Sequence, residues 1–419
     1  MERGKEKMKK RRRILSLVFA ACLVITGIVS GAGVQKAEAA ARTEVIDVTD
    51  YGVYPDSGKD SAIGIQKAIA AAKDATKEGK EVKINFPEGR YDIYPDKAIE
   101  RELYVSNTVG ADQNNKMKKI GIFLEDMDHV TVDGNNSLFM FHGKMTTFAT
   151  IGCEDVEFKN FAVDFQVPTV IDMTVESVEG NTATMYIPEC YNYEVAGTTI
   201  KWYSDVSPYT GQRYWSISDL SGYHTQREDT VQGIKFGAGN GNAALKGVAS
   251  IEDLGNHRVK ITYNSKAGEV QNGMCFQSRP TVRDHAGTFF WKSKDIKMTS
   301  LDIQFLHGFG MVGQHSENIT MEDVDFEAPK ESGRTTAGYA DFVQMSGCKG
   351  AININNCTFA GPHDDPINIH GTFNTVTSIS SDRRTITVQY NHHETAGFPN
   401  FFKGDEIEFM TKGNMITVE

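Results

Sequence analysis

The sequence predicts an all-β fold in which short strands stack as successive coils, that is, a parallel β-helix. Short runs of Val, Ile and Phe together with 39 glycines are typical of strands joined by turns. One pattern also recurs: Asn or Asp, apolar, any residue, apolar, two polar residues, apolar, any residue, apolar. Its copies lie at 127–132, 154–163, 294–303, 317–326 and 350–359. Period-2 alternation on both sides of a polar pair predicts two short strands joined by a bend.

The spacing of the copies predicts that they stack. Equivalent apolar residues are 26 residues apart from Val130 to Val156, 23 apart from Ile296 to Ile319, and 33 apart from there to Ile352. Repeats of this length are typical of solenoids, and units made only of strands predict a β-helix. We expect ladders of inward Val, Ile, Met and Phe, and Asn side chains that hydrogen-bond between coils at the bends. A β-sandwich is the alternative, but it does not require one pattern at near-constant spacing.

Residues 1–39 have the composition of a secretory signal peptide. A basic run at 9–13 precedes an apolar stretch from Ile14 to Val34 and the small-x-small sequence Ala37-Glu38-Ala39. A membrane anchor is the alternative, because the apolar stretch has about 20 residues. The cleavage pattern favours secretion, and no later segment is apolar enough to span a bilayer. We therefore expect a secreted or cell-surface protein without stable membrane insertion.

Residues 40–166 are expected to form an N-terminal cap and the first coils. Asp60 and Ser61 can cap a helix. Its apolar positions recur at helical spacing: Ile65, Ala68, Ile69 and Ala72. Since a solenoid needs a capped end, this helix is expected to cover the first coil, beside a buried strand at 82–86.

Two segments interrupt the repeat. Residues 167–280 and 372–419 contain alternating runs joined by turns, and the run at 197–202 is echoed at 404–409. We expect two related antiparallel β modules, small barrels inserted into the helix, with the coils resuming over 281–371. The sequence stops inside a strand-like run, so we expect the second module to be truncated and the chain to be a C-terminally incomplete version of a longer protein.

Charge and cysteine content limit the partners. Residues 1–39 hold nine Lys and Arg and three Asp and Glu, which leaves 35 against 52 and a mature net charge near −17. Such a chain repels nucleic acid and anionic membrane surfaces, whereas neutral sugars fit. The five mature cysteines have no Cys-x-x-Cys spacing, which argues against a zinc site and a disulfide framework. One bridge remains possible.

Three aspartates are the candidate catalytic residues. Asp341 precedes the adjacent pair Asp364 and Asp365 by about one repeat, so stacked coils would bring the three carboxylates together, with Asp341 beneath Asp364. Clustered carboxylates raise one another's pKa, and glycoside hydrolysis needs one carboxylic acid and one carboxylate. A calcium site of a lyase is one alternative, although the segment 341–371 holds only one basic residue, Lys349. A solvated turn is the other alternative.

The same region resembles glycoside hydrolase family 110, the exo-acting α-1,3-galactosidases that remove terminal galactose from blood-group-B-type glycans. A more distant resemblance is to the polygalacturonase-type β-helix hydrolases, which share the pectin-lyase-like fold. The motifs that carry it are Gly313-Gln314, Gly333-Arg334, Ala340-Asp341-Phe342, Lys349-Gly350 and Asp364-Asp365-Pro366-Ile367-Asn368-Ile369-His370-Gly371. The resemblance covers about residues 45–419, and the missing C-terminal portion is its main departure from the family.

The resemblance implies an inverting hydrolase on a right-handed parallel β-helix, with no metal or organic cofactor. On that analogy Asp364 is the general acid, while Asp341 and Asp365 hold and deprotonate the attacking water. Residues next to the acids, or on the loops around the expected cleft, are candidates for substrate binding: Arg334, Gln344, His363, Asn368 and His370. The alternatives are another β-helix polysaccharide hydrolase or lyase, and a non-catalytic glycan-binding β-helix. The sequence does not indicate an oligomeric state.

Overall fold

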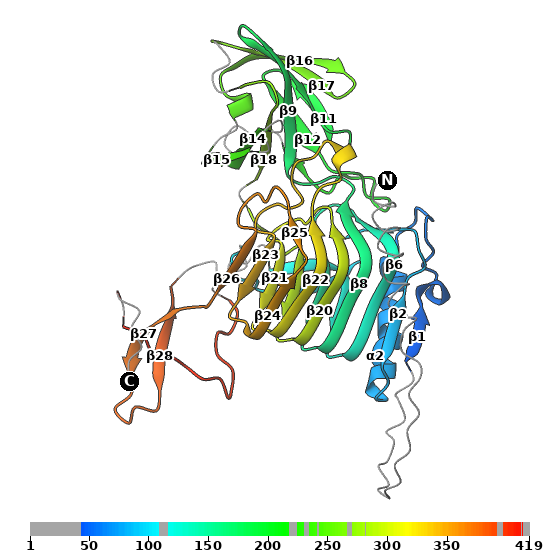
Figure 1. Cartoon of the computed structure of the whole chain (residues 1–419), viewed down its shortest axis with the longest axis vertical. Helices are drawn as coiled ribbons and strands as arrows, with labels where there is room; N and C mark the ends of the chain where they lie inside the picture. Colours follow the sequence, from blue (N-terminus) through cyan, green and yellow to red (C-terminus); the bar gives the residue numbers. More distant parts are fainter. Residues whose placement is uncertain are drawn as a thin grey trace, which may run out of the picture. The chain divides into compact units, whose positions relative to one another are not determined.

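The computed structural model describes residues 43–108, 116–217, 224–229, 234–240, 243–265, 270–280, 282–391, 397–411 and 413. The predicted signal peptide lies outside these residues. Two parallel sheets form the predicted β-helix (Figure 1). The first has the order β1 (Glu44–Asp47), β2 (Val82–Asn85), β6 (Asp128–Phe141), β8 (Glu154–Phe165), β20 (Lys294–Ile303), β22 (Glu317–Phe326) and β24 (Lys349–Asn355), with β3 (Arg90–Ile93) beside β6 and β25 (Thr358–Phe359) beside β22.

The second sheet carries the candidate site at one end. Its order is β4 (Ile99–Glu102), β5 (Met117–Glu125), β7 (Thr146–Ile151), β19 (Thr288–Trp291), β21 (Met311–Gln314), β23 (Val343–Ser346) and β26 (Ile367–His370). All neighbours in it pair in parallel except β4 and β5. From β5 to β26 the chain therefore passes alternately through the two sheets, apart from the inserted segment.

The strand register confirms the predicted repeat. Val130 pairs with Val156, Ile296 with Ile319, and Ile319 with Ile352, at the offsets expected from the sequence. Val156 also pairs with Ile296, although 140 residues separate them. The inward residues form continuous buried ladders, so one apolar core runs through the coils.

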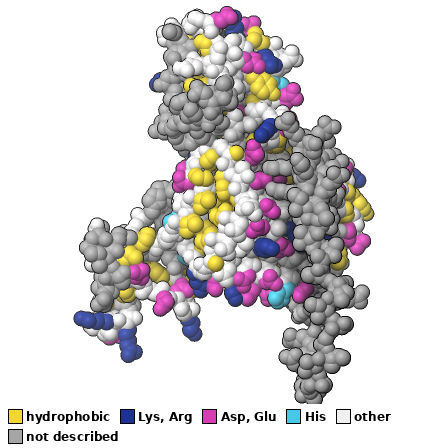
Figure 2. Space-filling view, in the orientation of Figure 1, with side chains coloured by type: hydrophobic (Ala, Val, Ile, Leu, Met, Phe, Trp, Pro, Cys, Tyr) yellow, Lys and Arg dark blue, Asp and Glu magenta, His cyan; other side chains and the backbone are white. Residues whose placement is uncertain are grey.

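The polar bends of the repeat adopt left-handed backbone conformations. Positive φ angles of 52–58° occur at Asn160, Ser300, Asp323 and Asn356. Asn and Asp tolerate this region better than most residues, which explains their recurrence in the pattern. The predicted hydrogen bonds between coils are present: the Asn356 amide donates to Glu322 at 3.0 Å, and the Asn160 amide donates to Asp133 at 3.0 Å. Acidic and basic side chains are interspersed along the outer face of the coils (Figure 2).

The predicted cap is helix α2 (Ala62–Lys77), which follows η1 (Val48–Tyr51) and packs on β2 and β5. Ile65, Ala68 and Ala72 are fully buried, as the helical spacing predicts. Ser61 is the N-cap residue, but its side chain makes no capping bond. Asp60 accepts instead from the Ala62 N–H at 3.0 Å. Within the described residues, no helix combines the length and apolar character needed to cross a bilayer.

The first interruption is an antiparallel β segment, as predicted. A seven-stranded sheet has the order β15 (Ile234–Asn240), β14 (His224–Asp229), β18 (Met274–Arg279), β9 (Ile171–Glu179), β10 (Thr182–Tyr186), β17 (Arg258–Tyr263) and β16 (Val248–Gly255). A smaller sheet contains β11 (Asn192–Ala196), β12 (Thr199–Tyr203) and β13 (Ser216–Ile217), and η3 (Ala243–Leu245) precedes β16. These elements have their own apolar core, so the segment is packed independently of the coil ladders.

The second interruption contains the hairpin of β27 (Asn374–Ile379) and β28 (Ile386–Tyr390). The expected echo of 197–202 is wrong as a structural match. Residues 199–203 form β12, whereas 404–409 form no strand. No strand of the described residues pairs with the later run, and a strand requires a partner. The five cysteines of the described residues are free.

Candidate active site

Loops before two neighbouring strands carry the three aspartates. Asp341 lies two residues before β23, and Asp364 and Asp365 lie just before β26. Val343 pairs with Ile367, an offset of 24 residues. Extending this register backwards aligns Asp341 with Asp365, and the Phe342 N–H donates to the Asp365 carbonyl at 3.0 Å. The expected stacking of Asp341 beneath Asp364 is therefore wrong by one residue, because this coil is one residue longer than the 23-residue repeat.

The predicted convergence of the carboxylates is nevertheless present. One oxygen from each of Asp341, Asp364 and Asp365 lies within 4.8 Å of the others. Asp341 is 2% exposed, whereas Asp364 and Asp365 are exposed. The cluster therefore has a buried floor and an open side that faces solvent.

Asn368 ties two of the three acids together. Its Nδ2 donates to Asp365 Oδ2 at 3.1 Å and approaches Asp341 Oδ2 at 3.4 Å. Asp364 is outside this bridge. The three acids thus divide into a bridged pair and one separate, exposed carboxyl group.

Burial makes the Asp341 carboxyl group a weaker acid than an ordinary aspartate. Desolvation, followed by the nearby Asp364 and Asp365 carboxylates, raises the pKa of Asp341 to about 7. Arg283 and the Asn368 amide oppose this shift but do not cancel it. Asp341 can therefore gain or release a proton close to neutral pH, the property required of a group that takes part in acid–base catalysis.

A buried arginine contacts both loops that carry the acids. The Nε–H of Arg279, the last residue of β18, donates to His363 Nδ1 at 3.0 Å. Its guanidinium lies 4.8 Å from the centre of the Tyr339 ring. His363 immediately precedes Asp364, and Tyr339 lies two residues before Asp341. The inserted segment therefore supports the acids, although sequence reasoning did not identify Arg279.

Two of the predicted substrate-binding residues hold the walls of the site. The buried His363 bonds to Arg279, as described above. Arg334 lies in the loop before Asp341, which contains η4 (Lys330–Ser332). Its guanidinium forms a bidentate ion pair with the Asp164 carboxylate, with N–O distances of 2.8 and 2.9 Å. Arg334 thereby anchors this loop to the end of β8.

Gln344 and His370 contact each other. The Gln344 amide donates to His370 Nε2 at 2.7 Å, and His370 Nδ1 lies 2.9 Å from the Gly371 carbonyl. Gln344 is fully buried. Of the five predicted substrate-binding residues, Asn368 hydrogen-bonds to two of the acids.

A second group of side chains of the kind that can bind a metal ion lies nearby and consists of Asp284, His285 and His307. Asp284 Oδ1 lies 3.1 Å from His285 Nδ1 and 2.7 Å from His307 Nε2, and Lys144 donates to its Oδ2 at 3.1 Å. Burial lowers the pKa of His307 to about 4, so its ring is neutral. These bonds and the lysine charge disfavour a metal ion. His307 also meets the Tyr339 ring edge to face at 5.1 Å, so the group braces the loop of Asp341.

Comparison with known proteins supports the resemblance seen in the sequence. No family model matches the chain. It is 43% identical over 391 residues to a protein of Streptomyces avermitilis named alpha-1,3-galactosidase A, covering 92% of this chain and 61% of that one. A protein of the same name from Bacteroides fragilis is 32% identical over 378 residues, covering 90% and 59%. The chain thus spans about three fifths of the length of these relatives.

Solved structures are more distant. The family 28 exopolygalacturonase of Yersinia enterocolitica has a TM-score of 0.32 at 12% identity, over 79% of this chain and 45% of that one. The strand pairing described above therefore carries the assignment of the parallel β-helix.

Proposed function

We propose that this chain, a homologue of proteins named alpha-1,3-galactosidase over about nine tenths of its length, forms the catalytic β-helix of an α-1,3-galactosidase. The observation that carries the proposal is the cluster of three carboxylates within 4.8 Å, one of which has a pKa of about 7. A solvent-facing cluster of carboxyl groups, one of which gains and releases its proton close to neutral pH, suits cleavage of a glycosidic bond.

The geometry supports different roles for the acids. The general acid must touch the glycosidic oxygen, and the exposed Asp364 can do so whereas the buried Asp341 cannot. Asp364 then gives its proton to the leaving oxygen as the bond from this oxygen to C1 breaks. A water molecule held by Asp341 and Asp365 attacks C1 and gives its proton to that pair. Asn368 fixes the two carboxylates relative to each other. This sequence of events inverts the configuration at C1.

The proposed substrate is a neutral glycan with terminal α-1,3-linked galactose, of the blood-group-B type. The acidic composition of the chain supports a neutral ligand over a uronic polymer. Secretion is part of the same proposal, because residues 1–39 have the composition of a signal peptide. Arg279 and Arg283 do bring positive charge near the acids. A uronic polymer therefore belongs in the test.

The decisive experiment is proton NMR of the galactose first released from the blood-group-B trisaccharide. Inversion predicts β-galactose, and initial α-galactose would contradict the assigned roles. Turnover is expected to persist in a chelator, whereas activity on polygalacturonate that needs calcium would replace the proposal with a lyase.

A matched pair of variants tests the acid. Asp364→Asn should keep the fold and lower kcat by about 10²–10⁴-fold, because the proton donor is lost. Asp295→Asn is the control. Asp295 is exposed on the outer face of the first sheet, and its φ of 54° suits Asn. An Asp364→Asn enzyme as active as this control would refute the role of Asp364.

A further inference from the structure

A cleft with both acidic and basic walls lies on the N-terminal coils, away from the three catalytic acids. It measures about 500 Å³, within the usual range for small-ligand sites. Its lining residues are Asp56, Gly58, Arg90, Asp92, Tyr94, His142, Gln166, Asp205 and Val206. Strands β8 and β20 separate β6, which precedes His142, from β22, which precedes Asp341. At roughly 4.8 Å per coil, His142 in the cleft is roughly 14 Å along the helix from Asp341 and roughly 19 Å from Asp365.

Three stacked side chains form one wall. Ile93 pairs with Phe141, and Phe141 with Phe165. The next residues, Tyr94, His142 and Gln166, therefore occupy one position in three successive coils. The rings of Tyr94 and His142 are stacked, with centroids 3.7 Å apart and planes 12° apart. The β-helix thus presents an aromatic and polar column to the cleft.

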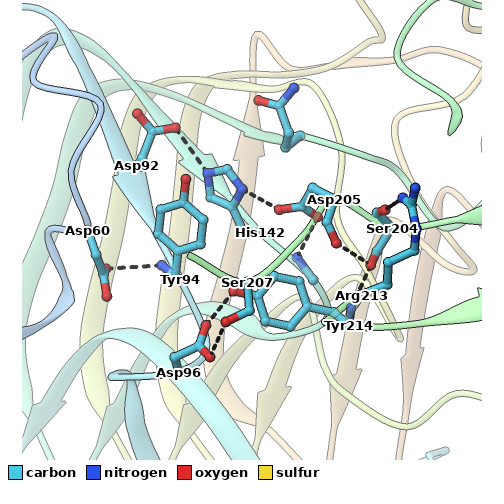
Figure 3. Close-up of polar contacts among 12 residues, drawn as sticks. Asp60, Asp92, Tyr94, Asp96, His142, Ser204, Asp205, Ser207, Arg213 and Tyr214 are labelled. Atoms are coloured by element: carbon cyan, nitrogen blue, oxygen red, sulfur yellow. Dashed lines mark hydrogen bonds and ion pairs between the residues drawn. The ribbon is translucent and has the colours of Figure 1, made fainter. Parts of the chain in front are cut away.

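The inserted segment closes the opposite side. Asp205, which follows β12, accepts from His142 Nδ1 at 2.6 Å, while Asp92 accepts from Nε2 of the same ring at 3.0 Å (Figure 3). Figure 3 also shows Ser207 and Tyr214 directed at Asp96. These bonds join residues 50 to 118 positions apart in the sequence, so the walls of the cleft are fixed before any ligand arrives.

The charges in the cleft select the kind of ligand. Its walls carry the carboxylates of Asp56, Asp92 and Asp205, together with the guanidinium of Arg90 and the His142 ring held between two carboxylates. A phosphate or sulfate would meet three carboxylates. A cation would meet Arg90 and His142, which already neutralise Asp92. A neutral ligand avoids both conflicts.

The cleft also offers groups that suit hydroxyls. Arg90 uses Nε and Nη2 to bond Asp92 and Gln166 Oε1. Among the described residues, Arg90 Nη1, Gln166 Nε2 and the Tyr94 hydroxyl make no hydrogen bond to protein. These donors stand beside carboxylate acceptors, and a sugar hydroxyl both donates and accepts. From this arrangement we propose that the cleft is a second, non-catalytic binding site for a neutral saccharide unit.

The test blocks the cleft without touching its hydrogen bonds. Val206 is 46% exposed at its edge, and Val206→Trp fills the space. Val45→Trp is the matched control, because Val45 is 60% exposed on β1 and does not line the cleft. Both changes are made in the full chain carrying Asp364→Asn, and each protein is applied to an array of neutral, sulfated and uronic oligosaccharides.

We expect Val206→Trp to weaken binding of at least one neutral saccharide by roughly tenfold or more, while Val45→Trp leaves it unchanged. Equal binding of all neutral saccharides by both variants would overturn the proposal, as would loss confined to sulfated or uronic ligands. With Asp364 intact, Val206→Trp should hydrolyse the B trisaccharide at the normal rate. Failure of the second site is therefore distinguishable from failure of the proposed catalytic function.

Discussion

Replacement of Arg279 by Met tests whether the inserted segment positions the catalytic acids. The change keeps the apolar length of the side chain but removes the Nε–H bond to His363 and the contact with the Tyr339 ring. Loss of a donor to a buried acceptor costs about 1–3 kcal/mol. Loss of the cation–π contact costs about 0.5–2 kcal/mol.

Part of this cost is offset. Desolvation lowers the pKa of Arg279, which shows that its charge is held in the interior at a cost. We therefore expect Arg279→Met to reduce the free energy of unfolding by about 1–3 kcal/mol. The effect on catalysis is larger, because a shift of about 1 Å in a catalytic group can cost about 10²-fold in rate. We expect kcat to fall by this order while KM changes little.

The assay is steady-state hydrolysis of the B trisaccharide, combined with urea denaturation of the same samples. Arg258→Met is the matched control, since Arg258 lies in the same inserted segment and forms an exposed ion pair with Glu176 at 2.8 Å. Such surface pairs contribute about 0–1 kcal/mol. Arg279→Lys, which keeps the charge but not the planar fork, should be intermediate. If Arg279→Met matches Arg258→Met in both kcat and stability, the positioning argument is refuted.

Two further predictions concern pH. The pKa of Asp341 is raised from 3.8 to about 7 in the folded chain, so the folded state holds this proton more tightly than the unfolded state, and stability is lost as pH rises between these values. Asp341→Asn should therefore be inactive, yet its free energy of unfolding at pH 8 should exceed that of the parent by roughly 4 kcal/mol. In urea titrations this gain in stability should vanish near pH 4. The same stability difference at both pH values would contradict the burial of the Asp341 carboxyl group. Desolvation opposes the charging of His142, but the Asp205 and Asp92 carboxylates that hold the ring raise its pKa above 6.5. The contribution of the charged His142 ring to stability is therefore complete below pH 6.5 and is lost as pH rises through the pKa of the folded state. His142→Gln should cost more stability at about pH 5.5 than at about pH 9, and equal losses at both would show that His142 is not charged in the fold.

The fold was predictable because its signal is local. Asn160, Ser300, Asp323 and Asn356 recur at bends that need a positive φ, and the apolar residues on each side alternate with the strand period. Both properties depend on residues within one coil. The repeat offsets then gave the pairing register directly.

The site was predictable only in part. The three aspartates and Asn368 follow one strand register, so a sequence pattern could place them together, although an extra residue in the coil changed the partner of Asp341 from Asp364 to Asp365. The contacts of Arg279 and Arg334 depend on chain segments 84 and 170 residues away. No periodicity links such segments, since their meeting depends on how the inserted sheets pack.

The pairing of β8 with β20 across the inserted segment has a consequence for how the protein acquires its fold. The first coils present β8 as an open edge until β20 has been made, about 130 residues later. At the usual rate of translation this interval is on the order of ten seconds. An uncovered parallel edge is a template for wrong partners during that time. Because the inserted segment has its own core, it can fold first. Its folding shortens the flexible loop between β8 and β20 and thereby reduces the entropic cost of bringing these two strands together.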